Sequence, residues 1–352
     1  MSEREKQLAI LGGRTLDKIP FMPRLEIWYE ANYLAGTLPP EYQGKRLSEV
    51  QDDIGVGATG RTGHVCTTRI RGVEIIERRI GLKTQTEYVT PIGTVTTTHQ
   101  RTENIDNAGI MPLEVEHMIK TEADYDVATY IAENTEYYPA YEQFEAYDGD
   151  IGGRGLPLIM VGDVPFHHFL NISVGYGKSY LDLMDYPDKV ERLVTAMEHN
   201  LREKMWPVLA NSPGTLFLHG MNLASTTTPP SLFDKYLTPY MREFADYMHA
   251  HGKYVAHHAD NDTGKILSQL KDTHYDMHEC FATAPLVPTT LKEARTGLGP
   301  DVTIFGAIPS VVLEEDFTES EFEAHMEEVF DSIAPGDRTI LGIADNMMPT
   351  SS

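Results

Sequence analysis

The chain has 352 residues, of which 41% are hydrophobic and 23% charged, so its composition is that of a globular protein and excludes a disordered or fibrous one. No run of about 18 apolar residues occurs, and a membrane-spanning helix is therefore not expected. The formal net charge of −24 argues against a nucleic-acid partner, because a polyanion is bound by clustered basic residues. The charged start, MSEREKQ, does not resemble a secretory signal, so we expect a cytoplasmic protein.

The first 150 residues show an irregular pattern. Ile19–Trp28 is an apolar run that predicts a first strand. Val73–Arg79, Lys83–Val89 and Gly93–Gln100 predict a small antiparallel meander, with a turn around Pro91. We interpret this part as an N-terminal elaboration.

From residue 151 onward, short β-branched or apolar runs alternate with amphipathic stretches, the signature of βα units in a parallel sheet. The predicted strands are Leu156–Asp163, Thr215–Gly220, Lys253–Asp260, Tyr275–Phe281, Val302–Pro309 and Arg338–Asp345. The predicted helices are Lys189–Ala210, Asp234–His251 and Glu319–Ile333, each with apolar residues at spacings of three and four.

These elements predict an α/β fold, a single (β/α)8 TIM barrel that spans residues 1–352 as one domain. Residues 1–150 would be its irregular N-terminal part with the meander, and residues 151–352 its regular βα units. Seven strands can be named, and the eighth is expected in the N-terminal part.

Several predicted strands end in a titratable side chain. These ends are Asp163, His219, Asp260, Glu279 and Asp345. Because the carboxyl ends of barrel strands meet at one mouth, where catalysis takes place, the set predicts an active site. Each acidic residue taken alone has another explanation, since it can cap the helix that follows.

Strand alternation separates the residues of His257-His258-Ala259-Asp260. His258 and Asp260 share one face and are expected at the mouth, whereas His257 faces the surrounding helices as a core residue. An H-x-D pair with a distant carboxylate can bind zinc or another divalent ion.

The order and spacing of these motifs resemble the uroporphyrinogen decarboxylase superfamily over nearly the whole chain, and more closely its corrinoid-dependent methyltransferase branch. His258-Ala259-Asp260-Asn261 is similar to the branch's H-x-C-G or H-x-D-G strand, and Glu279 to Pro285 is similar to E-x-F-T-P with a small insertion. Phe305-Gly306-Ala307-Ile308-Pro309 also fits, and Asp345 stands four residues before Pro349, where the family has a third ligand.

True uroporphyrinogen decarboxylases carry an R-Q-A-G-R segment that gathers substrate carboxylates. The corresponding stretch, Phe21–Tyr29, keeps one arginine, Arg24, so porphyrinogen decarboxylation is disfavoured. The family's D-x-H-x-x-G cobalt-ligating pattern is absent, and the resemblance therefore implies a corrinoid that a separate protein supplies.

The resemblance implies a zinc ion and an O-demethylase type of methyltransferase. Aspartates stand where thiol-methylating relatives have cysteines, and such a zinc would be a stronger Lewis acid suited to an ether oxygen. The implied metal ligands are His258, Asp260, Asp345 and Glu279. The implied catalytic residues are Glu279 and His219, and the implied substrate-binding residues are Trp28, Tyr29, Glu26, Met221 and His167. For Trp28, Tyr29 and Met221, ordinary core packing is an equal alternative.

Two other functions stay open at this point. One is a metal-independent decarboxylase or lyase of the same fold that acts on a small acid, and the other is a binding protein that has lost its site. The predicted partners are a corrinoid protein and a small methoxylated substrate. The identity of the methyl donor and the oligomeric state are open, with a homodimer among the alternatives.

Overall fold

The structure is a computed structural model that describes residues 1–102, 105 and 111–351. The chain forms two compact units, each assembled from separate stretches of sequence. Unit 1 comprises residues 1–64, 142–162 and 213–352, and unit 2 comprises residues 65–141 and 163–212. Neither unit begins or ends at residue 150, and the expectation of a single domain stays a prediction.

Unit 1 is built around a six-stranded parallel sheet whose strands follow the chain in order, β7-β8-β9-β10-β11-β12. The strands are β7 Leu158–Met160, β8 Leu216–His219, β9 Tyr254–His258, β10 Met277–Phe281, β11 Thr303–Pro309 and β12 Thr339–Ala344. All six lie within the six strands predicted for the second half of the chain. The α/β fold with a parallel sheet is therefore confirmed.

Two extended segments of the N-terminal part continue the hydrogen bonding beyond the sheet's edges. Met22 donates its N–H to the carbonyl of Leu341 in β12 at 2.8 Å, and Gly57 donates to Phe21 at 3.1 Å. On the other side, Leu158 of β7 donates to Gly60 at 3.0 Å. Backbone hydrogen bonds thus lead from β12 through both segments to β7.

One face of the sheet forms the core of unit 1. Its side chains alternate along the strands, as a period of two requires. The core residues are Ile10, Leu11, Met22, Leu156, Leu158, Leu216, Leu218, Ala256, Met277, Phe305 and Ile340. Because Ala256 and Met277 point into this core, His258 and Glu279, two residues farther along each strand, point the same way.

Helices lie between the strands of unit 1. The best-defined start is that of α15, Glu319–Ile333, where Thr318 and Glu321 form a capping box. It occupies the same residues as the predicted helix. The other helices are α1 Glu3–Leu11, α2 Glu26–Ala35, η1 Pro40–Tyr42, α3 Leu47–Ile54, α6 Tyr141–Ile151, η2 Gly152–Arg154, α11 Pro230–Leu232, η5 Phe233–Leu237, α12 Thr238–Ala250, η6 Gly264–Ile266, α13 Leu267–Lys271, α14 Leu291–Leu298 and η7 Ser310–Leu313.

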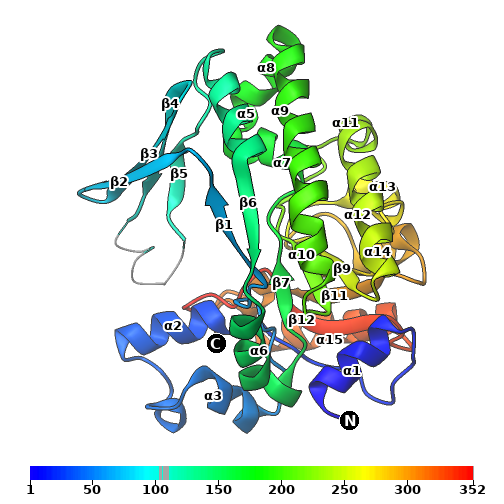
Figure 1. Cartoon of the computed structure of the whole chain (residues 1–352). Coiled ribbons are helices and arrows are strands. Elements are labelled where there is room, and N and C mark those ends of the chain that lie inside the picture. The colour runs from blue at the N-terminus through cyan, green and yellow to red at the C-terminus, as the bar shows by residue number, and fades with distance from the viewer. Residues whose placement is uncertain (103–104, 106–110, 352) are drawn as a thin grey trace. The chain divides into compact units, whose positions relative to one another are not determined.

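Unit 2 contains two small antiparallel sheets (Figure 1). The strands β1 Cys66–Ile70 and β6 Thr135–Pro139 pair with each other. A four-stranded sheet has the order β2-β3-β4-β5, with β2 Glu74–Ile80, β3 Lys83–Thr90, β4 Gly93–Gln100 and β5 Leu113–Glu116. Val95 of this sheet packs against Val127 and Ile131 of the helix α5, Asp124–Asn134, which gives the unit an apolar core.

The helices of unit 2 include one that sequence periodicity predicted as continuous. The stretch Lys189–Ala210 is helical, but its turn Leu201–Met205 widens to a π-helix. Pro207 follows, and because proline has no N–H and its ring collides with the carbonyl four residues earlier, the helix loosens there. The helices are α5 Asp124–Asn134, α7 Pro165–His168, η3 Phe169–Ser173, α8 Tyr176–Asp185, α9 Pro187–Asn200, η4 Leu201–Met205 and α10 Trp206–Ala210.

One predicted strand is partly wrong. Ile19–Trp28 was expected to be extended throughout, whereas α2 begins at Glu26, so Trp28 lies on a helix. The predicted strand was too long because the periodicity of this run cannot distinguish a buried strand from the first turn of a helix. Among the described residues, no helix is long and apolar enough to cross a membrane.

Candidate active site

His258 and Glu279 are brought together by the register of two neighbouring strands. In the parallel pair β9 and β10, His258 lies directly beside Glu279, and His257 lies beside His278. The His258 Nδ1 atom is 2.7 Å from Glu279 Oε2, and its Nε2 atom is 3.1 Å from Asp260 Oδ2. The imidazole therefore bridges two carboxylates at the carboxyl ends of the strands.

A β-bulge adds Cys280 to this group. The register between β10 and β11 shifts between Glu279 and Phe281, and Cys280 has a φ of 55°. Simple alternation would send its side chain to the opposite face from Glu279, but the bulge re-aims it. Its thiol donates to Glu279 Oε1 at 3.1 Å.

Two guanidinium groups complete the cluster. Arg61 forms an ion pair with Glu279 Oε1, and Arg24 donates from Nη1 to the Cys280 sulfur at 3.1 Å. The Glu279 side chain is fully buried and that of His258 is 8% exposed, so these charges interact with little solvent screening. We call His258, Asp260, Glu279, Cys280 and the two arginines the charge cluster.

The charges shift the pKa values of the cluster in opposite directions. Burial alone would raise the pKa of Glu279, but Arg61 and His258 outweigh it and hold that pKa well below its usual range. Burial alone would lower the pKa of His258, but the Glu279 carboxylate and the hydrogen bonds around the ring raise that pKa well above its ordinary value. The structure therefore favours an ionised Glu279 beside an imidazolium.

The thiol behaves differently. Burial and the neighbouring Glu279 raise the pKa of Cys280, although the nearby Arg24 opposes that shift. In this arrangement Cys280 is a protonated donor, and it becomes a thiolate when a cation replaces its proton.

Three side chains of the cluster are placed to hold a metal ion. One ligand atom each from His258, Glu279 and Cys280 lies within 4.8 Å of the others, and all three residues are buried. Asp260 and Asp345, which the sequence predicted as ligands, are not in this group. Asp345 follows β12 with a φ of 69°, and its side chain accepts a hydrogen bond from Asn346 at 2.8 Å. Its backbone carbonyl, 3.6 Å from the Cys280 sulfur, is the part that faces the cluster.

Glu26 lies near the cluster, at the start of α2. Its Oε1 atom accepts a hydrogen bond from Thr59 at 2.6 Å, whereas Oε2 is buried and makes none. The Nε atom of Arg24 is likewise buried without a hydrogen bond. A donor and an acceptor that lack partners are suited to bind a ligand, because leaving such groups buried costs about 1–3 kcal/mol each.

Three predicted substrate-binding residues, Trp28, Tyr29 and Met221, have structural roles in the described contacts. The Tyr29 hydroxyl donates to the carbonyl of Lys45 at 2.7 Å, and its ring stacks on Tyr33. The Trp28 carbonyl accepts from Asn32 of the same helix at 2.8 Å. Met221 is fully buried. Nothing in these contacts assigns substrate binding to the three residues.

His219 lies away from the charge cluster. Its neighbours in β8, Leu216 and Leu218, point into the core, so alternation turns His219 toward the helices. There its Nδ1 atom is 2.6 Å from the Tyr275 hydroxyl, and its ring packs edge-on against Phe244 of α12. The predicted catalytic role would need His219 on the other face, and the arrangement does not support it.

Asp163 and His167 belong to unit 2. The His167 Nδ1 atom is 2.8 Å from Asp163 Oδ2, and its Nε2 atom is 2.8 Å from the Tyr176 hydroxyl. His167 is fully buried in this chain of hydrogen bonds. It is a satisfied interior histidine of its own unit, and its predicted role in substrate binding stays a prediction.

Three residues of the cluster, Arg24, Arg61 and Cys280, were not predicted as site residues from the sequence. Arg61 lies in a turn of the N-terminal part, where the sequence has no strand pattern, so no motif pointed to it. Cys280 directly follows Glu279, and strand alternation would place its side chain on the opposite face. A positive φ at a non-glycine residue is visible only in the structure, which is why the bulge could not be predicted.

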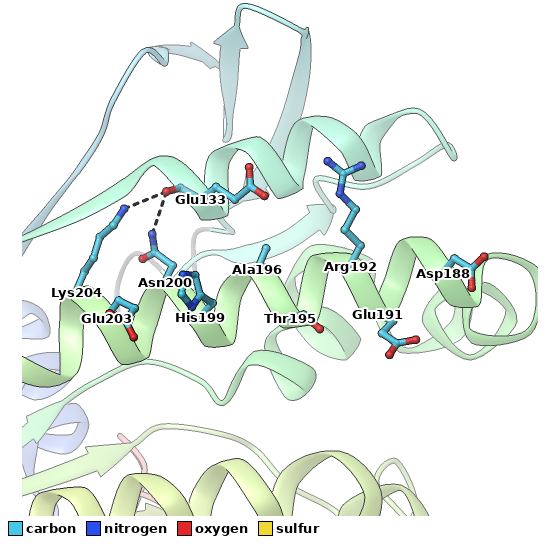
Figure 2. A pocket seen from close by; sticks show the side chains of 10 residues that line it. All are labelled: Glu133, Asp188, Glu191, Arg192, Thr195, Ala196, His199, Asn200, Glu203 and Lys204. Carbon is cyan, nitrogen blue, oxygen red and sulfur yellow. Dashed lines mark hydrogen bonds between the residues drawn. The ribbon is translucent and has the colours of Figure 1, made fainter.

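A groove of about 600 Å³ lies along α9 and η4 in unit 2, and Figure 2 shows its lining. Lys204 and Asn200 both donate to the backbone carbonyl of Glu133, at 3.0 and 3.1 Å. The lining mixes both signs of charge and contains none of the predicted site residues. The groove therefore does not compete with the charge cluster as the candidate active site.

Comparisons with known proteins identify the family of this chain. A solved structure of a methyltransferase from Methanosarcina mazei is similar over 100% of this chain and 95% of that chain, with a TM-score of 0.57 and 13% sequence identity, a likeness that concerns the fold alone. No protein with a curated description matches. Residues 115–352, which include His258, Glu279 and Cys280, match the family described as Uroporphyrinogen decarboxylase (URO-D). The chain therefore belongs to the uroporphyrinogen decarboxylase family.

Proposed function

We propose that this protein is a methyltransferase that moves a methyl group from a small methoxylated, aromatic substrate to the Co(I) of a separate corrinoid protein, assisted by a zinc ion. The observation that carries the proposal is the buried group of His258, Glu279 and Cys280, whose ligand atoms lie within 4.8 Å of one another. The likeness in fold to the Methanosarcina mazei methyltransferase supports it.

The proposal includes a closed (β/α)8 barrel. Six of its strands would be β7 to β12, and the two N-terminal segments around Phe21 and Gly57 would be the other two. The hydrogen bonds from Met22 to Leu341 and from Leu158 to Gly60 support this closure. In a barrel the carboxyl ends of β9 and β10 open at the mouth, where a substrate and a partner protein can reach them.

The donor set fits zinc. Imidazole nitrogen, carboxylate oxygen and thiolate sulfur are its ordinary ligands, and three protein ligands leave a fourth position for substrate, as in catalytic zinc sites. Bound there, the ion would supply Lewis-acid chemistry to the ether oxygen of the substrate. Arg24, 3.1 Å from the sulfur, favours the thiolate that zinc requires.

The chain's own residues would hold the site in place. Arg61 fixes the Glu279 carboxylate through Oε1, and Asp260 orients the His258 ring through Nε2. Arg24 Nε and Glu26 Oε2, both buried without a hydrogen bond, would bind polar groups of the substrate. Because Glu279 is ionised, its role is to bind and to stabilise charge, and it is not the proton donor.

The charges of the cluster support a second candidate, a metal-independent decarboxylase or lyase that acts on a small acid. Without a metal, His258 is an imidazolium between Glu279 and Asp260, and Arg24 and Arg61 supply positive charge for a carboxylate. In such a reaction the bond to the carboxyl carbon breaks, carbon dioxide leaves, and the carbanion takes a proton from His258. General acid catalysis of this kind contributes about 10²–10⁴-fold.

The experiment mixes zinc-supplied protein with cob(I)alamin and guaiacol without oxygen and follows the cobalamin spectrum. We expect methylcobalamin to form with the wild type, to be abolished in His258→Ala, and to persist in the control His251→Ala, since His251 is exposed and bonds only locally to Tyr247 in the described contacts. Release of carbon dioxide from small acids by metal-free protein, with no methylcobalamin, would favour the second candidate. Full zinc binding and full turnover in His258→Ala would contradict the ligand assignment.

A further inference from the structure

The strand β2 in unit 2 forms a free edge of its sheet. In the order β2-β3-β4-β5 it pairs with β3 alone, so among the described residues no strand hydrogen-bonds to its other side. The opposite edge, β5, has four residues and a register shift at Thr98 and His99, features that discourage further pairing. In contrast, β2 has seven residues in regular register with β3. It is therefore the edge that can accept another strand.

Large apolar side chains are exposed on and beside β2. Ile75 is 50% exposed, Ile80 66%, and Leu82 in the adjoining turn 46%. Exposed apolar side chains on a free edge strand favour its pairing with another strand.

The hairpin between β2 and β3 fixes which backbone groups face outward. Ile80 pairs with Lys83 across the two-residue turn Gly81-Leu82, and Gly81 has a φ of 63°. In a two-residue hairpin the closing pair is hydrogen-bonded, and hydrogen-bonded pairs alternate along the ladder. Even-numbered residues of β2 thus bond to β3, whereas residues 75, 77 and 79 direct their N–H and C=O groups to the free edge.

The side chains on one face of β2 are self-complementary. Glu74, Ile76 and Arg78 share that face, and Arg78 stays 57% exposed while it pairs with Glu87 of β3 at 3.1 Å. In an antiparallel pair of two copies with Ile76 opposite Ile76, each Glu74 lies opposite Arg78 of the other copy. The two apolar side chains then meet at the centre with an ion pair on either side.

Other symmetric registers are worse, because an axis at residue 75 places each Glu74 opposite Ile76 and forms no ion pair. An axis at residue 77 places two Glu77 carboxylates opposite each other, and an axis at residue 78 places two Arg78 guanidiniums opposite each other. Like charges directly opposite each other destabilise a sheet. We propose that two copies of this chain pair antiparallel through β2 about a two-fold axis at Ile76, which joins their sheets into one. Such an interface is closed, so it yields a dimer and not a filament.

The test is a cysteine scan of the full chain in a Cys66→Ser background, because Cys280 is buried. In the proposed register Ile76 and its symmetry mate form a pair without backbone hydrogen bonds, with Cα atoms about 4.5 Å apart, which suits a disulfide. Residue 78 would lie about 13 Å from its mate and residue 80 about 27 Å, at 3.3–3.4 Å per residue. We expect Ile76→Cys to form a cross-linked dimer under mild oxidation, and Arg78→Cys and Ile80→Cys to stay uncross-linked.

Sedimentation velocity on proteins without added cysteines completes the test. The wild type is expected to be a dimer, and Ile76→Glu, which places two carboxylates at the axis, is expected to be a folded monomer by circular dichroism. If Ile76→Glu does not fold, the cysteine scan alone tests the proposed dimer and its register. A monomeric wild type at the highest soluble concentration, a dimer unchanged in Ile76→Glu, or cross-linking at residue 78 or 80 in place of 76 would each overturn the proposal.

Discussion

At the scale of single residues, the candidate site depends on where three side chains point. His258 and Glu279 share a face because they are in register, and Cys280 joins them because of a bulge. The sequence predicted the first two and placed Asp260 and Asp345 with them as ligands. In the structure Asp260 orients the imidazole and Asp345 presents its backbone carbonyl. The ligand set predicted from the sequence and the group of three in the structure therefore predict different effects of substitutions on zinc binding.

The first prediction separates these sets by zinc binding. Cys280→Ala should lower zinc affinity at least as much as the roughly 10- to 100-fold typical for loss of a supporting residue, because it removes a ligand atom itself. Asp345→Asn should retain zinc, since the Asp345 carboxylate lies outside the group of three. Zinc content after dialysis against a graded chelator measures both. Loss of zinc in Asp345→Asn with retention in Cys280→Ala would support the set predicted from the sequence.

A second prediction concerns His278, which lies on the opposite face from Glu279, with its Nδ1 atom 3.3 Å from that of His257. Burial lowers the pKa of His278 to about 3. Between about pH 6.5 and 3 the unfolded chain therefore binds a proton that the folded chain does not, so stability falls as the pH falls, by at most about 1.4 kcal/mol per pH unit.

The variant His278→Gln keeps a hydrogen-bonding side chain but cannot titrate. Urea unfolding at a series of pH values should show a shallower loss of stability on acidification than in the wild type. Parallel curves for the two proteins would mean that His278 does not contribute to the acid sensitivity.

At the scale of elements, the sequence predicted regular helices and strands well and their local distortions poorly. The helix α15 matches its prediction because its capping box and apolar stripe are both local signals. The π-turn before Pro207 and the start of α2 at Glu26 are distortions that periodicity does not reveal.

The third prediction tests the start of α15. Thr318 accepts a hydrogen bond from the backbone N–H of Glu321 at 3.3 Å through its hydroxyl. Thr318→Ala removes the cap and should lower the free energy of unfolding by about 1 kcal/mol, whereas Thr318→Ser keeps the hydroxyl and should cost much less. Urea unfolding measures the difference. Equal losses in both variants would indicate that packing of the threonine methyl group, and not capping, stabilises the helix.

At the scale of the whole molecule, the dominant property is the charge of −24. Like charges repel one another in the compact state, and salt screens that repulsion with a Debye length of about 10 Å at 0.1 M.

The fourth prediction follows from this repulsion. Raising sodium chloride at neutral pH should raise the melting temperature by several degrees, since about 1 kcal/mol corresponds to roughly 2–4 °C for chains of 150–250 residues. The effect should shrink near the isoelectric point of about 4.9, where the net charge vanishes. Differential scanning fluorimetry measures both conditions. A melting temperature that falls with salt at neutral pH would show that attractive ion pairs dominate instead.

The sequence by itself determined the parallel α/β architecture, the strands β7 to β12 and the position of His258 and Glu279 at strand ends, because periodicity and strand ends are local signals. Only the tertiary structure decided that Cys280, Arg24 and Arg61 join these two residues and that His219 turns away. A bulge, a loop-borne arginine and the face of a short strand depend on pairings between distant segments. Such pairings cannot be predicted from the residues that are close to one another in the sequence.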